Sequence, residues 1–102
     1  MHGDSAESRQ TQYLKEHFTY IRNTIAANLR YPSKARKMGW NGKLAIEFVI
    51  LESGTVDKIR VTRSSGIPLL DSDAEETVRR SAPFPKPPVS ARLVIPVEYV
   101  LK

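Results

Sequence analysis

The chain has 102 residues, contains no cysteine and carries a formal net charge of +5. This length suits one compact domain, and the lack of cysteine excludes a disulfide framework and thiol chemistry. No stretch approaches the roughly 20 apolar residues that a membrane-spanning helix needs. The positive charge is typical of a solvated basic surface, or of a surface that meets nucleic acid, a membrane or an acidic peptide.

The first segment, 1–12, is polar and is expected to be a disordered remnant of a leader or linker, with the folded domain at 13–102. An amphipathic helix is expected from about Thr11, because apolar residues then recur at spacings of three and four. These residues are Leu14, Phe18, Ile21, Ile25 and Leu29. The helix is expected to stop at Tyr31-Pro32, since the residue before a proline disfavours the α conformation.

Two further helices are expected, one on each side of a pair of strands. The first is short, because Pro32 can open it and Gly39 can cap its C-terminus. Ala35 and Met38 are its apolar residues. The second runs from about 70 to 82, with acidic residues in its first turns and arginines in its last. Ser72 and Glu75 are its candidate capping box.

A hairpin lies between these helices. The segment 43–51 alternates apolar and polar side chains, the segment 56–62 returns with a similar pattern, and Gly54 lies in the turn. The apolar parity of the second strand slips near Asp57-Lys58, which predicts a β-bulge there.

The final segment, 91–102, alternates as a half-buried strand does. Pro96 lies in its middle and cannot donate to a sheet ladder, so the strand is expected at a sheet edge. An edge strand exposes N–H and C=O groups that can pair with another extended chain. The predicted core row is Ala91, Leu93, Ile95, Val97, Tyr99 and Leu101, and the opposite row is Arg92, Val94, Pro96, Glu98 and Val100.

The order helix, short helix, strand, strand, helix, strand predicts an α+β fold. We expect a two-layer sandwich, in which a three-stranded antiparallel sheet is covered by helices on one face. The first strand is favoured in the centre, because this leaves the outer edge of the last strand free.

Catalysis, metal binding and nucleic-acid binding find little support. The segment 64–66 is more typical of a turn before a helix than of a nucleophile loop, because no histidine stands in a pattern suited to a base. His2 and His17 have no metal-ligand spacing. The segment 39–42 matches the GxxG loop of KH domains, but a strand follows it where a KH domain needs a helix. No enzymatic activity, cofactor, metal or nucleic acid is therefore expected.

An ordered series of short motifs is more specific than any of its members. In chain order they are Tyr31-Pro32, Ala35, Gly42, Phe48, Gly54-Thr55-Val56, Ser64-Ser65-Gly66, Leu70-Asp71-x-x-Ala74, Phe84-Pro85-x-Pro87 and Ile95-Pro96-Val97-Glu98-Tyr99. From about residue 17 to 101 the chain resembles the C-terminal domain of the TonB energy-transducing proteins.

This resemblance implies a periplasmic domain of a Gram-negative bacterium, tethered to the inner membrane by an N-terminal helix that is absent from this sequence. It implies binding to the TonB boxes of outer-membrane transporters. It also implies coupling of the proton-motive force, through a motor complex of the ExbB-ExbD type, to import of iron chelates or cobalamin. Peptidoglycan is a further candidate partner. The exposed edge is compatible with a monomer or an edge-paired dimer.

The resemblance also assigns site residues. The strand that pairs with the box corresponds to Arg92, Leu93, Val94, Ile95, Pro96, Val97, Glu98, Tyr99 and Val100. Candidate secondary contacts are Tyr31, Pro32, Arg30, Lys34, Arg36 and Lys37. For Tyr31-Pro32 the favoured alternative is a helix stop with a packed ring. The basic cluster consists of Arg30, Lys34, Arg36 and Lys37, and its favoured alternative is a solvated face. The other interpretation is that it steers the domain toward acidic groups, peptidoglycan or lipid headgroups.

Overall fold

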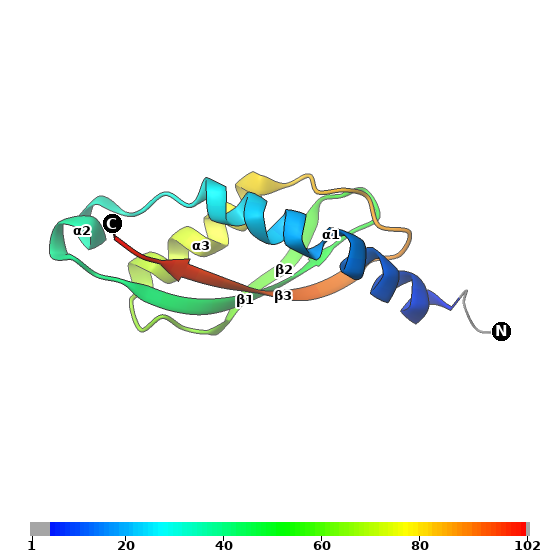
Figure 1. Cartoon of the computed structure of the whole chain (residues 1–102), viewed down its shortest axis with the longest axis horizontal. Coiled ribbons are helices and arrows are strands. Elements are labelled where there is room, and N and C mark those ends of the chain that lie inside the picture. Colours follow the sequence, from blue (N-terminus) through cyan, green and yellow to red (C-terminus); the bar gives the residue numbers. More distant parts are fainter. Residues whose placement is uncertain (1–4, 102) are drawn as a thin grey trace.

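The computed structural model describes residues 5–101 of the chain. Its elements, in order, are α1 (Ala6–Asn28), α2 (Ser33–Met38), β1 (Gly42–Ile50), β2 (Val56–Arg63), α3 (Pro68–Ser81) and β3 (Ala91–Tyr99). The three strands form one antiparallel sheet in the order β2-β1-β3, and the long helices cover one of its faces (Figure 1). The predicted α+β two-layer fold, with the first strand in the centre, is confirmed.

The core lies between the sheet and the two long helices. Helix α1 packs over β3, while α3 packs over β2 and β1. The apolar side chains with no exposed surface are Ile21, Ile25, Ala35, Ile46, Phe48, Ile50, Leu70, Ala74, Val78, Ala91 and Ile95. Burial of one large aliphatic side chain of this kind contributes about 1.5–3 kcal/mol. No helix within residues 5–101 is both long enough and apolar enough to cross a bilayer.

Helix α1 differs from its prediction at both ends. It begins at Ala6 rather than near Thr11, because the Ser5 hydroxyl caps it by accepting the backbone N–H of Ser8. Residues 6–12 of the expected disordered leader are therefore helical, and residues 1–4 lie outside the described range. The helix ends at Asn28, and Leu29 is already extended, so the chain leaves the α conformation before Tyr31-Pro32.

Helix α2 ends as predicted, because Gly39 takes the left-handed conformation (φ 72°) and its N–H donates to the Ala35 and Arg36 carbonyl oxygens. Its two apolar residues differ from each other. Ala35 is fully buried, whereas Met38 is 58% exposed. The helix is therefore attached to the domain through one small side chain and through the chain on either side of it.

The β1–β2 hairpin contains the predicted bulge and one further irregularity. The pairing advances by two residues on β1, from Glu47 to Val49, but by three on β2, from Arg60 to Asp57. Lys58 lies in this extra segment with a positive φ of 53°. A second shift occurs on β2 between its partners for Ala45 and Ile46, and the sequence pattern did not predict it.

The turn of the hairpin requires glycine at position 54. Gly54 has a φ of 91°, and its carbonyl oxygen accepts the Phe84 N–H at 2.8 Å. A Cβ added at this position would lie 2.5 Å from the Phe84 carbonyl oxygen. The close approach ties the turn to the connector that leads into β3.

Helix α3 begins with Pro68 at its first position and Ile67 as its N-cap, which has no side-chain cap bond. The predicted capping box of Ser72 and Glu75 is therefore wrong, because both residues lie inside the helix. The carboxylate of Asp71 instead orders the preceding loop.

Asp71 accepts the Ser65 backbone N–H at 3.0 Å, the Ser65 hydroxyl at 2.7 Å and the Ser64 hydroxyl. Partial burial opposes ionisation of Asp71, but these hydrogen bonds outweigh it and lower the pKa of the carboxyl group. The two serines are thus held as a turn before α3, as their sequence pattern favours.

Candidate partner-binding site

Strand β3 lies at one edge of the sheet, and within residues 5–101 β1 is the only strand it pairs with. Its nine pairs, from Gly42–Tyr99 to Ile50–Ala91, run without a register shift. Side chains alternate strictly between the helix-covered face and the open face of the sheet. The buried row consists of Ala91, Leu93, Ile95, Val97 and Tyr99, and the exposed row of Arg92, Val94, Pro96 and Glu98. The predicted rows are therefore confirmed within β3.

The backbone groups of β3 alternate as well, and two hydrogen bonds fix their direction. The N–H of Arg92 donates to the Gln10 side chain of α1, away from β1. The N–H of Leu101 donates to the Asn41 side chain, next to the start of β1. Since neighbouring residues of a strand direct their N–H and C=O groups to opposite sides, even-numbered residues face outward and odd-numbered residues face β1.

Pro96 falls in the outward row. It pairs with Ala45 without breaking the ladder, because the N–H that proline lacks would point away from β1. The edge position inferred from this proline is confirmed. The missing donor lies on the open side of the strand, in the middle of the row that a docking strand would meet.

The C-terminal half of β3 is fixed to the helical layer by Tyr99. Its hydroxyl donates to the Asp73 carboxylate of α3 at 2.6 Å, and its ring meets that of Tyr31 edge-on at 5.4 Å. The same carboxylate oxygen accepts the backbone N–H of Arg30 at 3.1 Å. Burial, and then the hydrogen bond to Asp73, raise the pKa of Tyr99, so its hydroxyl remains a donor at neutral pH. These contacts hold the edge strand in shape.

A small cavity of about 200 Å3 opens between α1 and β3. Helix α1 contributes Arg22, Ile25, Ala26 and Leu29 to its lining, and β3 contributes Pro96, Val97 and Glu98. The lining combines five apolar residues with the charged residues Arg22 and Glu98. A strand added beside β3 could place one side chain in this space. The predicted apolar stripe includes Ile25 and Leu29 but not Arg22 and Ala26, and no local pattern indicated that α1 would line the outer side of β3.

Two salt bridges that share Glu47 cross the open face of the sheet. The Glu47 carboxylate accepts hydrogen bonds from Arg60 of β2 at 2.8 Å and from Arg92 of β3 at 3.3 Å. The Arg60 hydrogen bond is the main cause that lowers the pKa of Glu47. Glu47 thereby joins all three strands. The Glu47 carboxylate also engages the guanidinium of Arg92, which belongs to the predicted binding strand.

The predicted secondary contacts gather near the α2 end of the domain, away from the first residues of β3 (Figure 1). Tyr31 is half-buried, and its hydroxyl donates to the Trp40 carbonyl oxygen, so its ring is packed. Pro32 is the N-cap of α2. The side chains of Arg30, Lys34, Arg36 and Lys37 are exposed, and none takes part in an ion pair found within residues 5–101.

The KH-type interpretation of 39–42 finds no structural support. Gly39 caps α2, and Gly42 already belongs to β1, so the loop does not join two helices. Phe48 and Tyr99, the aromatic residues of β1 and β3, are buried on the helix-covered face. They are not available to stack with bases.

Comparison with known proteins agrees with this architecture. Residues 27–101 match the family described as Gram-negative bacterial TonB protein C-terminal. Protein TonB of Helicobacter pylori (strain J99) is 35% identical over 83 residues, which are 80% of this chain and 30% of that protein. Protein TonB of Campylobacter coli is 30% identical over 97 residues, which are 94% of this chain and 40% of that protein. The chain thus spans less than half the length of these relatives.

Solved structures extend the likeness to three dimensions. An NMR solution structure of the Helicobacter pylori TonB C-terminal domain superposes with a TM-score of 0.78 at 32% identity, and the match covers 97% of each chain. The HasB C-terminal domain, at 23% identity and a TM-score of 0.55, shares the fold. These neighbours define a class of α+β domains with a helix-covered, three-stranded sheet. The family match covers most of the chain, and the chain therefore belongs to the TonB C-terminal domain family.

Proposed function

We propose that this domain binds the TonB boxes of outer-membrane transporters by β-strand addition to the outer edge of β3. The observation that carries the proposal is the outward backbone row of β3, which lies on an edge strand with an uninterrupted register. Family membership supports it, since TonB proteins are energy transducers. The proposed pairing row runs from Arg92 to Val100.

The same membership supports a wider role for the domain. The domain acts in the periplasm as the distal part of a protein tethered to the inner membrane. A motor of the ExbB-ExbD type supplies energy from the proton-motive force, and the docked transporter imports an iron chelate or cobalamin. The domain has no enzymatic part in this process. Main-chain pairing tolerates different partner sequences, which suits one transducer that serves several transporters.

Proline substitution in the outward row tests the proposal. Glu98→Pro removes an N–H that points away from β1, so the β1–β3 ladder should persist while one docking donor is lost. Leaving a peptide carbonyl unpaired costs about 1–3 kcal/mol, equivalent to roughly a 5- to 150-fold weaker affinity. The matched control, Glu98→Ala, keeps the N–H and reports the loss of the side chain alone, so it should bind more tightly than Glu98→Pro.

The measurement is an NMR titration of the labelled domain with a synthetic TonB-box peptide. In the parent, amide shifts concentrated in 92–100 are expected, with the largest perturbations in the outward row. Unchanged β1 amides in the free variant would establish that Glu98→Pro is folded. Equal affinity of the folded proline variant and the parent would sink the strand-addition proposal. Shifts confined to 30–37 would move the site to the basic cluster.

A further inference from the structure

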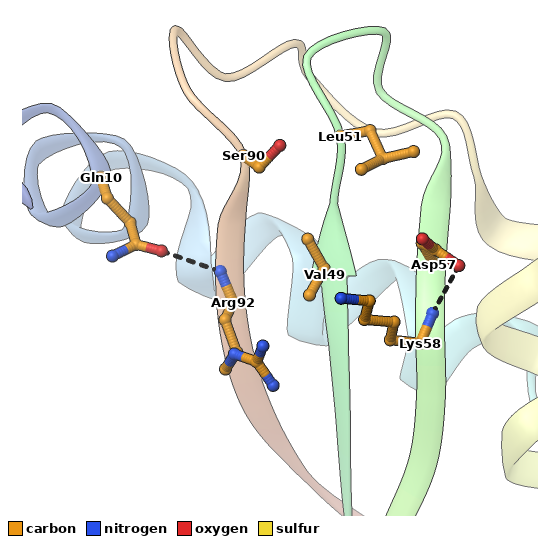
Figure 2. A pocket seen from close by; sticks show the side chains of 7 residues that line it. All are labelled: Gln10, Val49, Leu51, Asp57, Lys58, Ser90 and Arg92. Atoms are coloured by element: carbon orange, nitrogen blue, oxygen red, sulfur yellow. Dashed lines mark hydrogen bonds between the residues drawn. The ribbon is translucent and has the colours of Figure 1, made fainter. Parts of the chain in front are cut away.

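The outer edge of β3 is not open along its whole length. At its N-terminal end the Arg92 N–H donates to the side-chain oxygen of Gln10 at 3.0 Å, although the two residues are 82 positions apart. Figure 2 shows the Gln10 side chain reaching from α1 to the side of β3 that faces away from β1. Gln10 therefore takes the first outward donor of the edge.

The first turns of α1 are held at this position by a second contact. Tyr13 is only 3% exposed, and its hydroxyl donates to the Pro85 carbonyl oxygen at 2.5 Å. Burial raises the pKa of Tyr13 to about 12, so the phenol keeps its proton at physiological pH. Gln10 lies almost one helical turn before Tyr13. Because the Tyr13 ring fixes this part of α1, the Gln10 side chain is held beside β3.

The rest of the outward row is different. Beyond Arg92, the outward residues are Val94, Pro96 and Glu98, followed by Val100 after the strand ends. The cavity between α1 and β3 lies beside Pro96 and Glu98, so room for one side chain of a neighbouring strand remains there. Near Arg92 a pocket of about 330 Å3 is lined by Gln10, Ser90 and Arg92 among others (Figure 2), so the two ends of the edge differ in the outward donor that Gln10 takes and not in free space.

We propose that Gln10 is a register stop for the docked strand. The inference rests on the proposed function and adds where the paired segment ends: a partner strand pairs from Val94 toward Val100 and finds the Arg92 donor already taken. A partner that extends past Val94 gains nothing unless it displaces Gln10. Gln10 thus acts as a positioning residue that limits the length of partner chain held by this edge.

Three peptides test this inference in the full chain. One is a TonB-box peptide long enough to pair with 94–100, and the others extend it by two residues at its N-terminus or at its C-terminus. One extension then faces Arg92, whichever way the strand runs. For the parent chain, all three peptides should bind with affinities within about twofold. For Gln10→Ala, one extended peptide should bind about 3- to 10-fold tighter than the short one, as expected for one added backbone hydrogen bond.

The matched control is Gln12→Ala. The Gln12 side chain lies on the same helix but donates to Glu16 at 2.7 Å, and within residues 5–101 no hydrogen bond joins it to β3. Gln12→Ala should behave like the parent with all three peptides. In the free proteins, the Arg92 amide should exchange with solvent faster in Gln10→Ala than in the parent or in Gln12→Ala.

The outcomes separate the inference from the function beneath it. Peptide shifts along 94–100 with the same length dependence in Gln10→Ala and the parent would overturn the register stop alone. An extended peptide that binds the parent tightly and shifts the Gln10 side-chain amide would do the same. No peptide shifts in β3 in any variant would overturn the proposed function itself. A length gain confined to Gln10→Ala would support both.

Discussion

The two edges of the sheet are built differently. The β2 edge has two register shifts and a positive φ at Lys58, and its exposed residues include Asp57, Arg60 and Arg63. The β3 edge has nine regular pairs and a strict alternation of buried and exposed side chains. Bulges and charges are devices that protect an edge from pairing with another chain.

This difference indicates that only one edge is suited to a partner strand. On β2 the bulged backbone twists the outer N–H and C=O groups out of a regular row. On β3 the outward row is regular, but two of its positions offer no free N–H. The Arg92 N–H is bonded to Gln10, and Pro96 has no N–H. Under the proposed strand addition, these restrictions would confine pairing to a short stretch of β3.

Core truncation should give the largest difference between the edge strands. Ile95 of β3 is fully buried, whereas Val61 of β2 is only partly buried. Ile95→Ala should reduce the free energy of unfolding by about 2–5 kcal/mol through lost burial and a residual cavity. Val61→Ala should cost about 1 kcal/mol. Urea unfolding followed by circular dichroism measures both, and equal losses would contradict the view that β3 carries more of the core.

Acid should weaken the link between the two edges. The pKa of Glu47 is lowered in the folded state, first by the hydrogen bond from Arg60. A depressed carboxyl pKa stabilises the fold above the unfolded value of about 4.3, and that contribution is lost as the pH falls through the lower folded value. Unfolding at pH 7 and pH 3 should therefore show a larger acid loss in the parent than in Glu47→Gln. Identical losses would assign the acid sensitivity to other groups, such as Asp71.

The smallest effect concerns the bulge on β2. An L-residue at the positive φ of Lys58 is strained by roughly 1 kcal/mol, and glycine is not. Lys58→Gly should leave the free energy of unfolding unchanged or raise it by up to about 1 kcal/mol. Lys58→Val should lower it by about 1–2 kcal/mol, because a β-branched residue disfavours this conformation most. A thermal melt of the two variants checks the order, and a more stable valine variant would show that the bulge can be rearranged.

Much of the fold could be predicted because local patterns and global packing agree. The alternation of β3, the proline at its edge and the glycine cap of α2 each follow from backbone chemistry that neighbouring residues reveal. The bulge near Lys58 was visible because a parity slip leaves a mark in the order of apolar residues.

The predictions failed where specific side-chain contacts, instead of a periodic pattern of apolar residues, determine the structure. The start of α1 was missed because residues 6–12 show no apolar period, and Tyr13 lies beside the stripe instead of on it. Helix α3 begins at Pro68, before its predicted start near 70, because proline is favoured at the first position of a helix. The bond between Gln10 and Arg92 joins distant parts of the chain, so no local pattern could predict it.

The unbroken register between β3 and β1 has a mechanical consequence. Hydrogen bonds of an antiparallel ladder lie perpendicular to the strands. A partner strand docked on β3 and pulled along its own axis would therefore load the pairs between β3 and β1 in shear, all together, instead of peeling them one by one. Because the ladder of nine pairs has no bulge, tension would be shared along its whole length. Under such tension, the β1–β3 pairing would be the last part of the domain to separate.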